Sequence, residues 1–123
     1  MKDILLFKEG NFIFTYKKSL YKYQISLIEV VVCDKPYLEF YIQNGFFLLK
    51  ETIKSIIDKL PFSFIQISRK VVININCVKN ITKTKNMHEI QMTNKRTYEI
   101  SKRRYKKVVA LVMEHYNKNM IIA

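Results

Sequence analysis

The sequence predicts a mainly β fold, with antiparallel strands in small packed sheets, one short central helix and one C-terminal helix. Most apolar segments follow a period of two, as half-buried strands do. These segments are short, and turn-forming residues such as Asp34–Lys35–Pro36 and Asn44–Gly45 separate them. Only two segments show helical spacing. Strands at this density with short turns indicate antiparallel pairing rather than alternating β-α units.

Four strands are predicted before the first helix. The first alternates around Phe12 and Phe14, and the second is rich in β-branched residues and long enough to form one continuous strand. The third leads into Asn44–Gly45, a dipeptide that strongly favours a short hairpin turn. The predicted strands are 11–16, 24–33, 37–43 and 46–49.

The period changes in the middle of the chain. Between Ile53 and Leu60, apolar residues follow the i, i+3, i+4, i+7 spacing of one helical face. This spacing predicts a helix over about 51–60. Pro61 marks its end, because proline cannot continue a helix.

Strand patterns return after Pro61, and a second helix closes the chain. The segment 93–96 makes the turn between the last two strands. Ser101 is the predicted N-cap of a helix over about 102–117, with valines and tyrosines on its apolar side. The predicted strands of this half are 64–67, 71–75, 78–82, 87–92 and 97–100.

Length and composition predict a single folded domain over 1–123. The 123 residues are enough for one hydrophobic core, and 49% of them are hydrophobic. Cys33 and Cys77 lack the spacing of zinc ligands, and the histidines and acids form no catalytic pattern. We therefore expect no enzyme activity, metal or cofactor. No apolar run approaches a membrane span or a signal peptide, so we expect a cytoplasmic protein without membrane insertion.

Charge is the strongest feature of the composition, with a formal net charge of +12. Residues 1–61 hold nine cations and seven acids, whereas residues 62–123 hold thirteen cations and three acids. A lysine-rich surface alone would also raise the net charge. The concentration in one half instead indicates a polyanionic partner, of which nucleic acid is the commonest and an anionic membrane the next.

Two basic clusters stand out within that half. Arg69–Lys70 joins two strand patterns, at a junction where cations face either water or an anion. The second cluster, 102–107, opens the predicted C-terminal helix. Cations in a first helical turn are disfavoured by about 0.3–1 kcal/mol each, because that end of the helix dipole is positive. A helix start with three uncompensated cations attracts phosphate strongly.

These residues resemble the LytTR family of bacterial DNA-binding domains. The resemblance rests on FIQISRKVVININCVKNI at 64–81 and TYEISKRRYKKV at 97–108, and it covers about 20–116. Glu99 replaces the family's usual proline, and Lys102 adds a cation before the Arg-Arg pair. Residues 1–19 would form an N-terminal strand extension. The family's usual receiver domain is missing, so control by phosphorylation is not carried over.

The resemblance implies a transcription regulator whose loops, not a recognition helix, enter successive major grooves of duplex DNA. The implied tips are 34–37, Arg69–Lys70 and 102–104. We expect Arg69 and Arg103 to read guanine, because their planar donor forks match O6 and N7. The lysines and Arg104 are expected to position the protein on phosphates. The expected DNA-binding residues are Lys35, Tyr37, Arg69, Lys70, Lys102, Arg103, Arg104 and Lys106.

Two other functional classes compete with DNA binding. An RNA-binding β module would stack bases on exposed aromatics, but residues such as Phe12, Phe14 and Phe40 follow the core period. A protein that binds another anionic surface, such as a membrane, would favour a basic amphipathic helix, yet the cations of 102–117 gather at one end.

A homodimer on repeated half-sites and an unidentified regulatory partner protein are also expected.

Overall fold

The structure of the protein, a computed structural model, describes residues 5–119, which form three antiparallel sheets and two α-helices. Sheet orders are β1-β2-β3, β6-β5-β4-β8-β7 and β11-β10-β9. The strands are β1 (Leu5–Lys8), β2 (Asn11–Tyr16), β3 (Ser19–Gln24), β4 (Val30–Asp34), β5 (Tyr37–Ile42), β6 (Gly45–Leu49), β7 (Phe64–Ser68), β8 (Val71–Asn74), β9 (Val78–Thr84), β10 (Met87–Met92) and β11 (Thr97–Ile100). The helices are α1 (Ile53–Ile56) and α2 (Tyr105–Asn119), with 3-10 turns η1 (Ile25–Leu27), η2 (Ile57–Lys59) and η3 (Ile75–Cys77).

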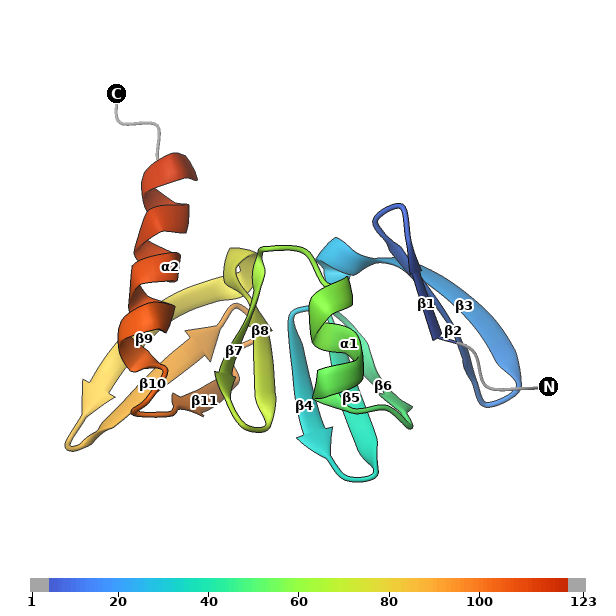
Figure 1. Ribbon diagram of the computed structural model, residues 1–123, viewed down its shortest axis with the longest axis horizontal. Helices are drawn as coiled ribbons and strands as arrows, with labels where there is room; N and C mark the ends of the chain where they lie inside the picture. Colours follow the sequence, from blue (N-terminus) through green and yellow to red (C-terminus); the bar gives the residue numbers. More distant parts are fainter. Residues whose placement is uncertain (1–4, 120–123) are drawn as a thin grey trace.

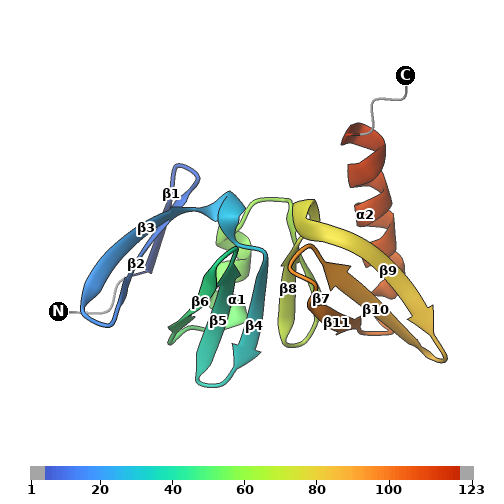
Figure 2. The ribbon, with the colours of Figure 1, turned by 180° about the vertical axis from the view of Figure 1, so that it is seen from behind.

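The three sheets follow one another along the long axis of the molecule (Figures 1 and 2). The N-terminal sheet lies at one end, the five-stranded sheet in the middle, and the third sheet with α2 at the other end. The mainly β antiparallel fold class that the sequence predicts is thus confirmed. None of the described helices is long and apolar enough to cross a membrane.

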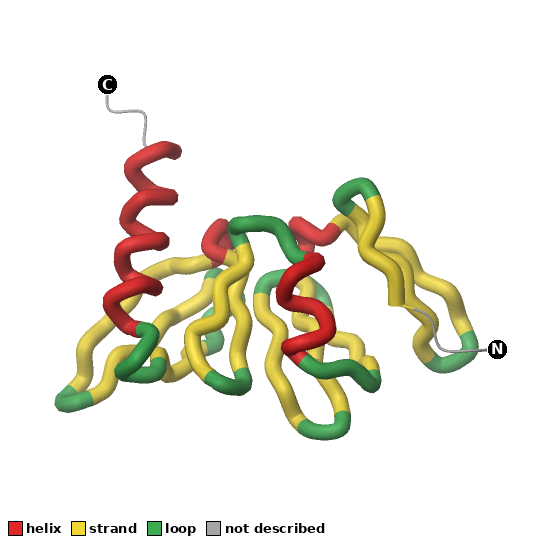
Figure 3. Tube along the Cα trace, viewed as in Figure 1, coloured by secondary structure: helices red, strands yellow, loops and turns green. Residues whose placement is uncertain are grey.

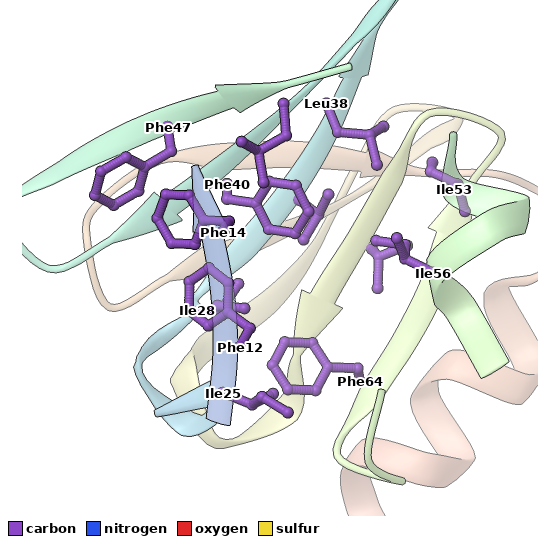
Figure 4. Packing of buried hydrophobic residues seen from close by; sticks show 13 residues of the cluster. Phe12, Phe14, Ile25, Ile28, Leu38, Phe40, Phe47, Ile53, Ile56 and Phe64 are labelled. Atoms are coloured by element: carbon purple, nitrogen blue, oxygen red, sulfur yellow. The ribbon is translucent and has the colours of Figure 1, made fainter. Parts of the chain in front are cut away.

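Two hydrophobic clusters form on opposite faces of the central sheet. In β4, Val31 belongs to one cluster and Val30 to the other, because successive side chains of a strand point to opposite faces. The first cluster joins the N-terminal sheet and α1 to the central sheet, and the stacked rings of Phe12 and Phe14, 4.9 Å apart, lie inside it (Figure 4). The second cluster joins the third sheet and α2, and it contains Val108 of the helix.

One predicted strand, 24–33, is wrong. The chain instead finishes β3, makes the 3-10 turn η1 and begins β4. Ile25 and Ile28 are both buried, and the Ile28 amide donates to the Ile25 carbonyl over 3.0 Å. The turn carries the chain from one sheet to the next, which a run of β-branched residues does not reveal. Strands β1 and β3 were not predicted, and residues 1–4 of the expected extension lie outside the described residues.

The hairpin predicted at Asn44–Gly45 forms between β5 and β6, but Gln43 and Asn44 make its turn. Gly45 already pairs with Ile42 across the ladder. The register is thus one residue earlier than the dipeptide indicates.

Both helices begin later in the sequence than predicted. Thr52 and Ser55 form a capping box, in which the Ser55 amide donates to Thr52 Oγ1 over 3.1 Å, so α1 begins at Ile53. Ser101 is not the N-cap of α2, which begins at Tyr105. The Ser101 amide donates to the Ile67 carbonyl of β7 over 2.9 Å, and its hydroxyl is buried without a hydrogen-bond partner. This hydrogen bond keeps the Ser101 backbone on the sheet, so residues 102–104 form a turn and the helix begins after them.

Candidate functional site

Four turns lie along one long edge of the molecule, the lower edge in Figures 1 and 3. We call this the turn edge. Every one of these turns carries at least one lysine or arginine. The turns are Lys35–Pro36 between β4 and β5, Arg69–Lys70 between β7 and β8, Lys85–Asn86 between β9 and β10, and Lys102–Arg104 before α2.

Backbone hydrogen bonds hold three of these turns in a fixed order. Strand β4 pairs with β8, so the first two turns are neighbours in one sheet, and the Cys33 amide donates to the Lys70 carbonyl over 2.7 Å. The bond from Ser101 to Ile67 attaches the turn before α2 to the end of β7. These bonds involve no cationic side chain, so the cations stay available to a ligand.

The β7–β8 turn is ordered locally by polar side chains. The Lys70 amide donates to Ser68 Oγ over 3.3 Å, and Gln66 Nε2 donates to the Arg69 carbonyl over 3.5 Å. A register shift between Gln66 and Ser68 interrupts the ladder just before the turn. Both Arg69 and Lys70 are exposed, so this turn presents two cations to solvent.

The turn before α2 differs from the sequence prediction in its relation to the helix. Lys102, Arg103 and Arg104 precede the first helical turn. The positive end of the helix dipole therefore disfavours them less than it would disfavour cations within that turn. Lys102 and Arg103 are exposed, whereas Arg104 is half-buried. Lys106 does lie in the first turn of α2 and is exposed.

Packing at the start of α2 fixes the direction of this turn. The Tyr105 ring stacks on His88 of β10 with ring centroids 3.4 Å apart, which makes Tyr105 a packing residue. The Val108 amide donates to the Arg104 carbonyl over 2.9 Å, and Val108 is buried in the second cluster. The basic turn is therefore anchored on both sides.

The predicted site residues are not all brought together. Lys35, Arg69 and Lys70 line one open hollow of about 1000 Å³. Tyr37, with 43% of its surface exposed, lines a different hollow beside the N-terminal sheet, together with Lys17. Tyr37 thus does not line the hollow that contains Arg69, although Lys50 and Glu51 border both hollows.

Two cations that sequence reasoning did not single out also lie at the turn edge. Lys85 lies at the tip of the β9–β10 hairpin, with a φ of 53°. Lys50 lines the same hollow as Arg69. A lysine in the short turn between two predicted strands was a usable signal for Lys85. Lys50 gave no such signal, because only the tertiary structure carries the start of α1 next to the β7–β8 turn.

The groups with clearly shifted pKa values lie away from the turn edge. Burial raises the pKa of Tyr98 to about 12 and also raises the pKa of the Cys77 thiol. Raised values keep both groups protonated at neutral pH. Within residues 5–119, histidines, cysteines and acids form no group able to hold a metal ion. The exposed cations of the turn edge form a surface that can attract an anion.

Comparison with known proteins places this fold among DNA-binding domains. A sequence model of the LytTR family, the LytTr DNA-binding domain, matches residues 18–113. The structure is similar to a solved LytTr DNA-binding domain from Bacillus cereus, with a TM-score of 0.75 and 16% identity, covering 85% of this chain and 98% of that chain. At this identity the likeness shows the fold alone. None of the curated proteins compared with the chain matches it.

Proposed function

The chain belongs to the LytTr DNA-binding domain family, and from this premise we propose that it regulates transcription by binding double-stranded DNA sequence-specifically. The observation that carries the proposal is the turn edge, where backbone hydrogen bonds hold three basic turns side by side. Such an edge presents short, rigid, cationic tips, which suit insertion into successive major grooves. No recognition helix is needed for this mode.

Within this proposal the cations have two roles. Arg69 and Arg103 are exposed at two of the tips and act as base readers, since guanidinium matches guanine O6 and N7 with two hydrogen bonds. The lysines at 35, 70, 102 and 106 contact phosphates, which position the protein without specifying a sequence. Arg104 is half-buried and borders a hollow beside η2, β7 and α2, so we assign it a phosphate contact and no base contact.

One copy offers a modest footprint for specificity in a genome. We therefore propose that two copies bind repeated half-sites and that they associate weakly or not at all without DNA. Control by a separate partner protein or by the protein's own abundance is part of the same proposal. Sedimentation at micromolar concentration without DNA tests the first point, and a tight dimer would contradict it.

Selection of bound sequences from a random duplex pool tests the proposed function most directly. The expected result is one enriched motif. Affinity for it should fall with salt at a log–log slope of about −5 to −7, if six to eight phosphates are neutralised. Single-stranded RNA and anionic liposomes serve as competitors in the same titration. No enriched motif, or a slope shallower than −2, would contradict the proposal.

A further inference from the structure

The hollow between the first two turns, which we call the turn hollow, has three walls from distant parts of the chain. One wall is the end of β4 and its turn, the second is the β7–β8 turn, and the third is Lys50 to Ile53 at the start of α1. In Figure 1 the loop from β6 to α1 lies above the β4–β5 turn. The hollow has a volume of about 1000 Å³ and is open to solvent.

Four cations and two acids line the turn hollow, so its charged lining is net positive. The exposed side chains of Lys35, Arg69 and Lys70 come from two walls, and exposed Lys50 comes from the third. The lining also contains the acids Asp34 and Glu51. Glu51 Oε2 accepts a hydrogen bond from Ser55 Oγ over 3.0 Å, which directs that carboxylate toward α1.

Hydrogen bonds fix the backbone on both sides of Lys50. On one side, the Glu51 amide donates to the Leu49 carbonyl over 2.9 Å. On the other, the capping box of Thr52 and Ser55 fixes the entry into α1, because two backbone amides are satisfied by side chains there. Leu49 is buried in the first cluster. The Lys50 side chain therefore starts from a fixed point of the wall, from which it borders both the turn hollow and the hollow beside Tyr37.

We propose that the turn hollow receives a stretch of the sugar–phosphate backbone of bound DNA and that Lys50 contacts a phosphate there. This inference rests on the proposed function and adds a residue that neither the sequence pattern nor the basic tips indicate. An ammonium group is a compact charge with three donors and recognises a phosphodiester without reading a base. The cations facing it across the hollow place the backbone between the two turns that carry Lys35 and Arg69.

Replacement of Lys50 by alanine in the full chain tests this contact. The expected effect is about five- to tenfold weaker binding at about 0.1 M salt, equal for the preferred duplex and for unrelated duplexes. The salt slope should shrink by about one unit. Lys50→Arg should restore both. Lys54→Ala is the matched control, because Lys54 is exposed on α1 outside the hollow and should leave affinity and slope unchanged.

The outcomes separate this inference from the proposed function. If Lys50→Ala binds like Lys54→Ala while Arg69→Ala loses discrimination, the phosphate contact is wrong and DNA recognition stands. If the wild-type chain prefers no duplex sequence, the proposed function itself is wrong, whatever Lys50→Ala does. In a parallel experiment, inorganic phosphate is titrated into the protein while NMR records the amide signals of Lys50 and Arg69. A chloride titration at equal ionic strength is the reference. Saturation by phosphate, with duplex affinity unaffected by Lys50→Ala, would make the hollow a free-anion site and overturn the proposal.

Discussion

The two long edges of the molecule are built in different ways. The turn edge ends in exposed cations, and the hydrogen bonds that join one of its turns to the next run between backbone groups. The opposite edge, which we call the linker edge, consists of the segments 25–29, 74–77 and 93–96. There polar side chains join segments that are distant in the sequence: Thr93 Oγ1, for example, donates to Glu29 Oε1 over 2.9 Å.

Asn74 shows most clearly what the difference means. It is fully buried, and its Nδ2 donates to the Ile28 carbonyl over 3.0 Å and to the Ser26 carbonyl over 3.4 Å. Its Oδ1 accepts from the Asn76 amide over 3.0 Å. One side chain thus joins η1, β8 and η3. We infer that the linker edge stabilises the arrangement of the sheets, whereas the turn edge is free to bind.

The largest expected effect is on the linker edge. Asn74→Ala should lower the free energy of unfolding by about 2–3 kcal/mol, because it leaves a buried carbonyl and a backbone amide without partners. Urea unfolding measures this. Duplex affinity of the folded fraction should not change. Asn76→Ala is the control, since Asn76 is exposed, and it should cost less than about 0.5 kcal/mol. Equal costs for the two variants would refute the linker role.

The next effect is on the turn edge. Arg69→Ala and Arg103→Ala should each lose about 1–3 kcal/mol of binding to the preferred duplex and flatten discrimination at one or two base positions. Their unfolding free energies should stay within about 0.5 kcal/mol of wild type. The measurement is a binding titration on single-base variants of the selected site.

Arg96→Ala is the matched control for those two arginines. Arg96 lies on the linker edge over the Tyr41 ring, 4.6 Å from its centroid, so its loss should cost about 0.5–1 kcal/mol of stability and no discrimination. If the turn-edge variants unfold the protein instead, those arginines are structural and the division between the edges fails.

A smaller effect is expected at Tyr98, whose hydroxyl is buried without a partner. Tyr98→Phe should raise the free energy of unfolding by about 1 kcal/mol at pH 8. Burial raises the pKa of Tyr98 to about 12, so the folded state holds this proton longer than the unfolded state. The Tyr98 contribution to wild-type stability therefore falls between about pH 10 and 12.

Unfolding of wild type and Tyr98→Phe at pH 8 and pH 11 isolates that contribution, because lysine titration is common to both. The advantage of the variant should be larger at pH 11. A variant less stable than wild type at pH 8 would show that the hydroxyl has a partner.

The smallest effect concerns individual phosphate contacts. Lys70→Ala and Lys106→Ala should weaken all duplexes alike and lower the salt slope by about one unit each, with stability changed by less than about 0.5 kcal/mol. Lys22→Ala, exposed on β3 of the N-terminal sheet, is the charge-matched control and should keep the wild-type slope. A Lys22 effect of equal size would mean that net charge, not the turn edge, governs binding.

The sequence by itself determined the class of fold and the basic tips. Alternation around Phe12 and Phe14 predicted a strand that forms as β2, and Asn44–Gly45 predicted a hairpin that forms with its turn one residue earlier. Such signals are local, because a strand's period and a turn's backbone preference depend on neighbouring residues. The cations at 69–70 and 102–104 are visible for the same reason, although their binding role stays a prediction.

Only the tertiary structure decided how these parts meet. The break at η1 exists because the chain must cross between two sheets, and α2 starts late because Ser101 is bonded to the end of β7. Lys50 joins the lining of the turn hollow because α1 packs on the central sheet, about twenty residues in sequence from Arg69. Contacts between distant segments depend on the simultaneous burial of both hydrophobic clusters. A short stretch of sequence carries no information about that burial.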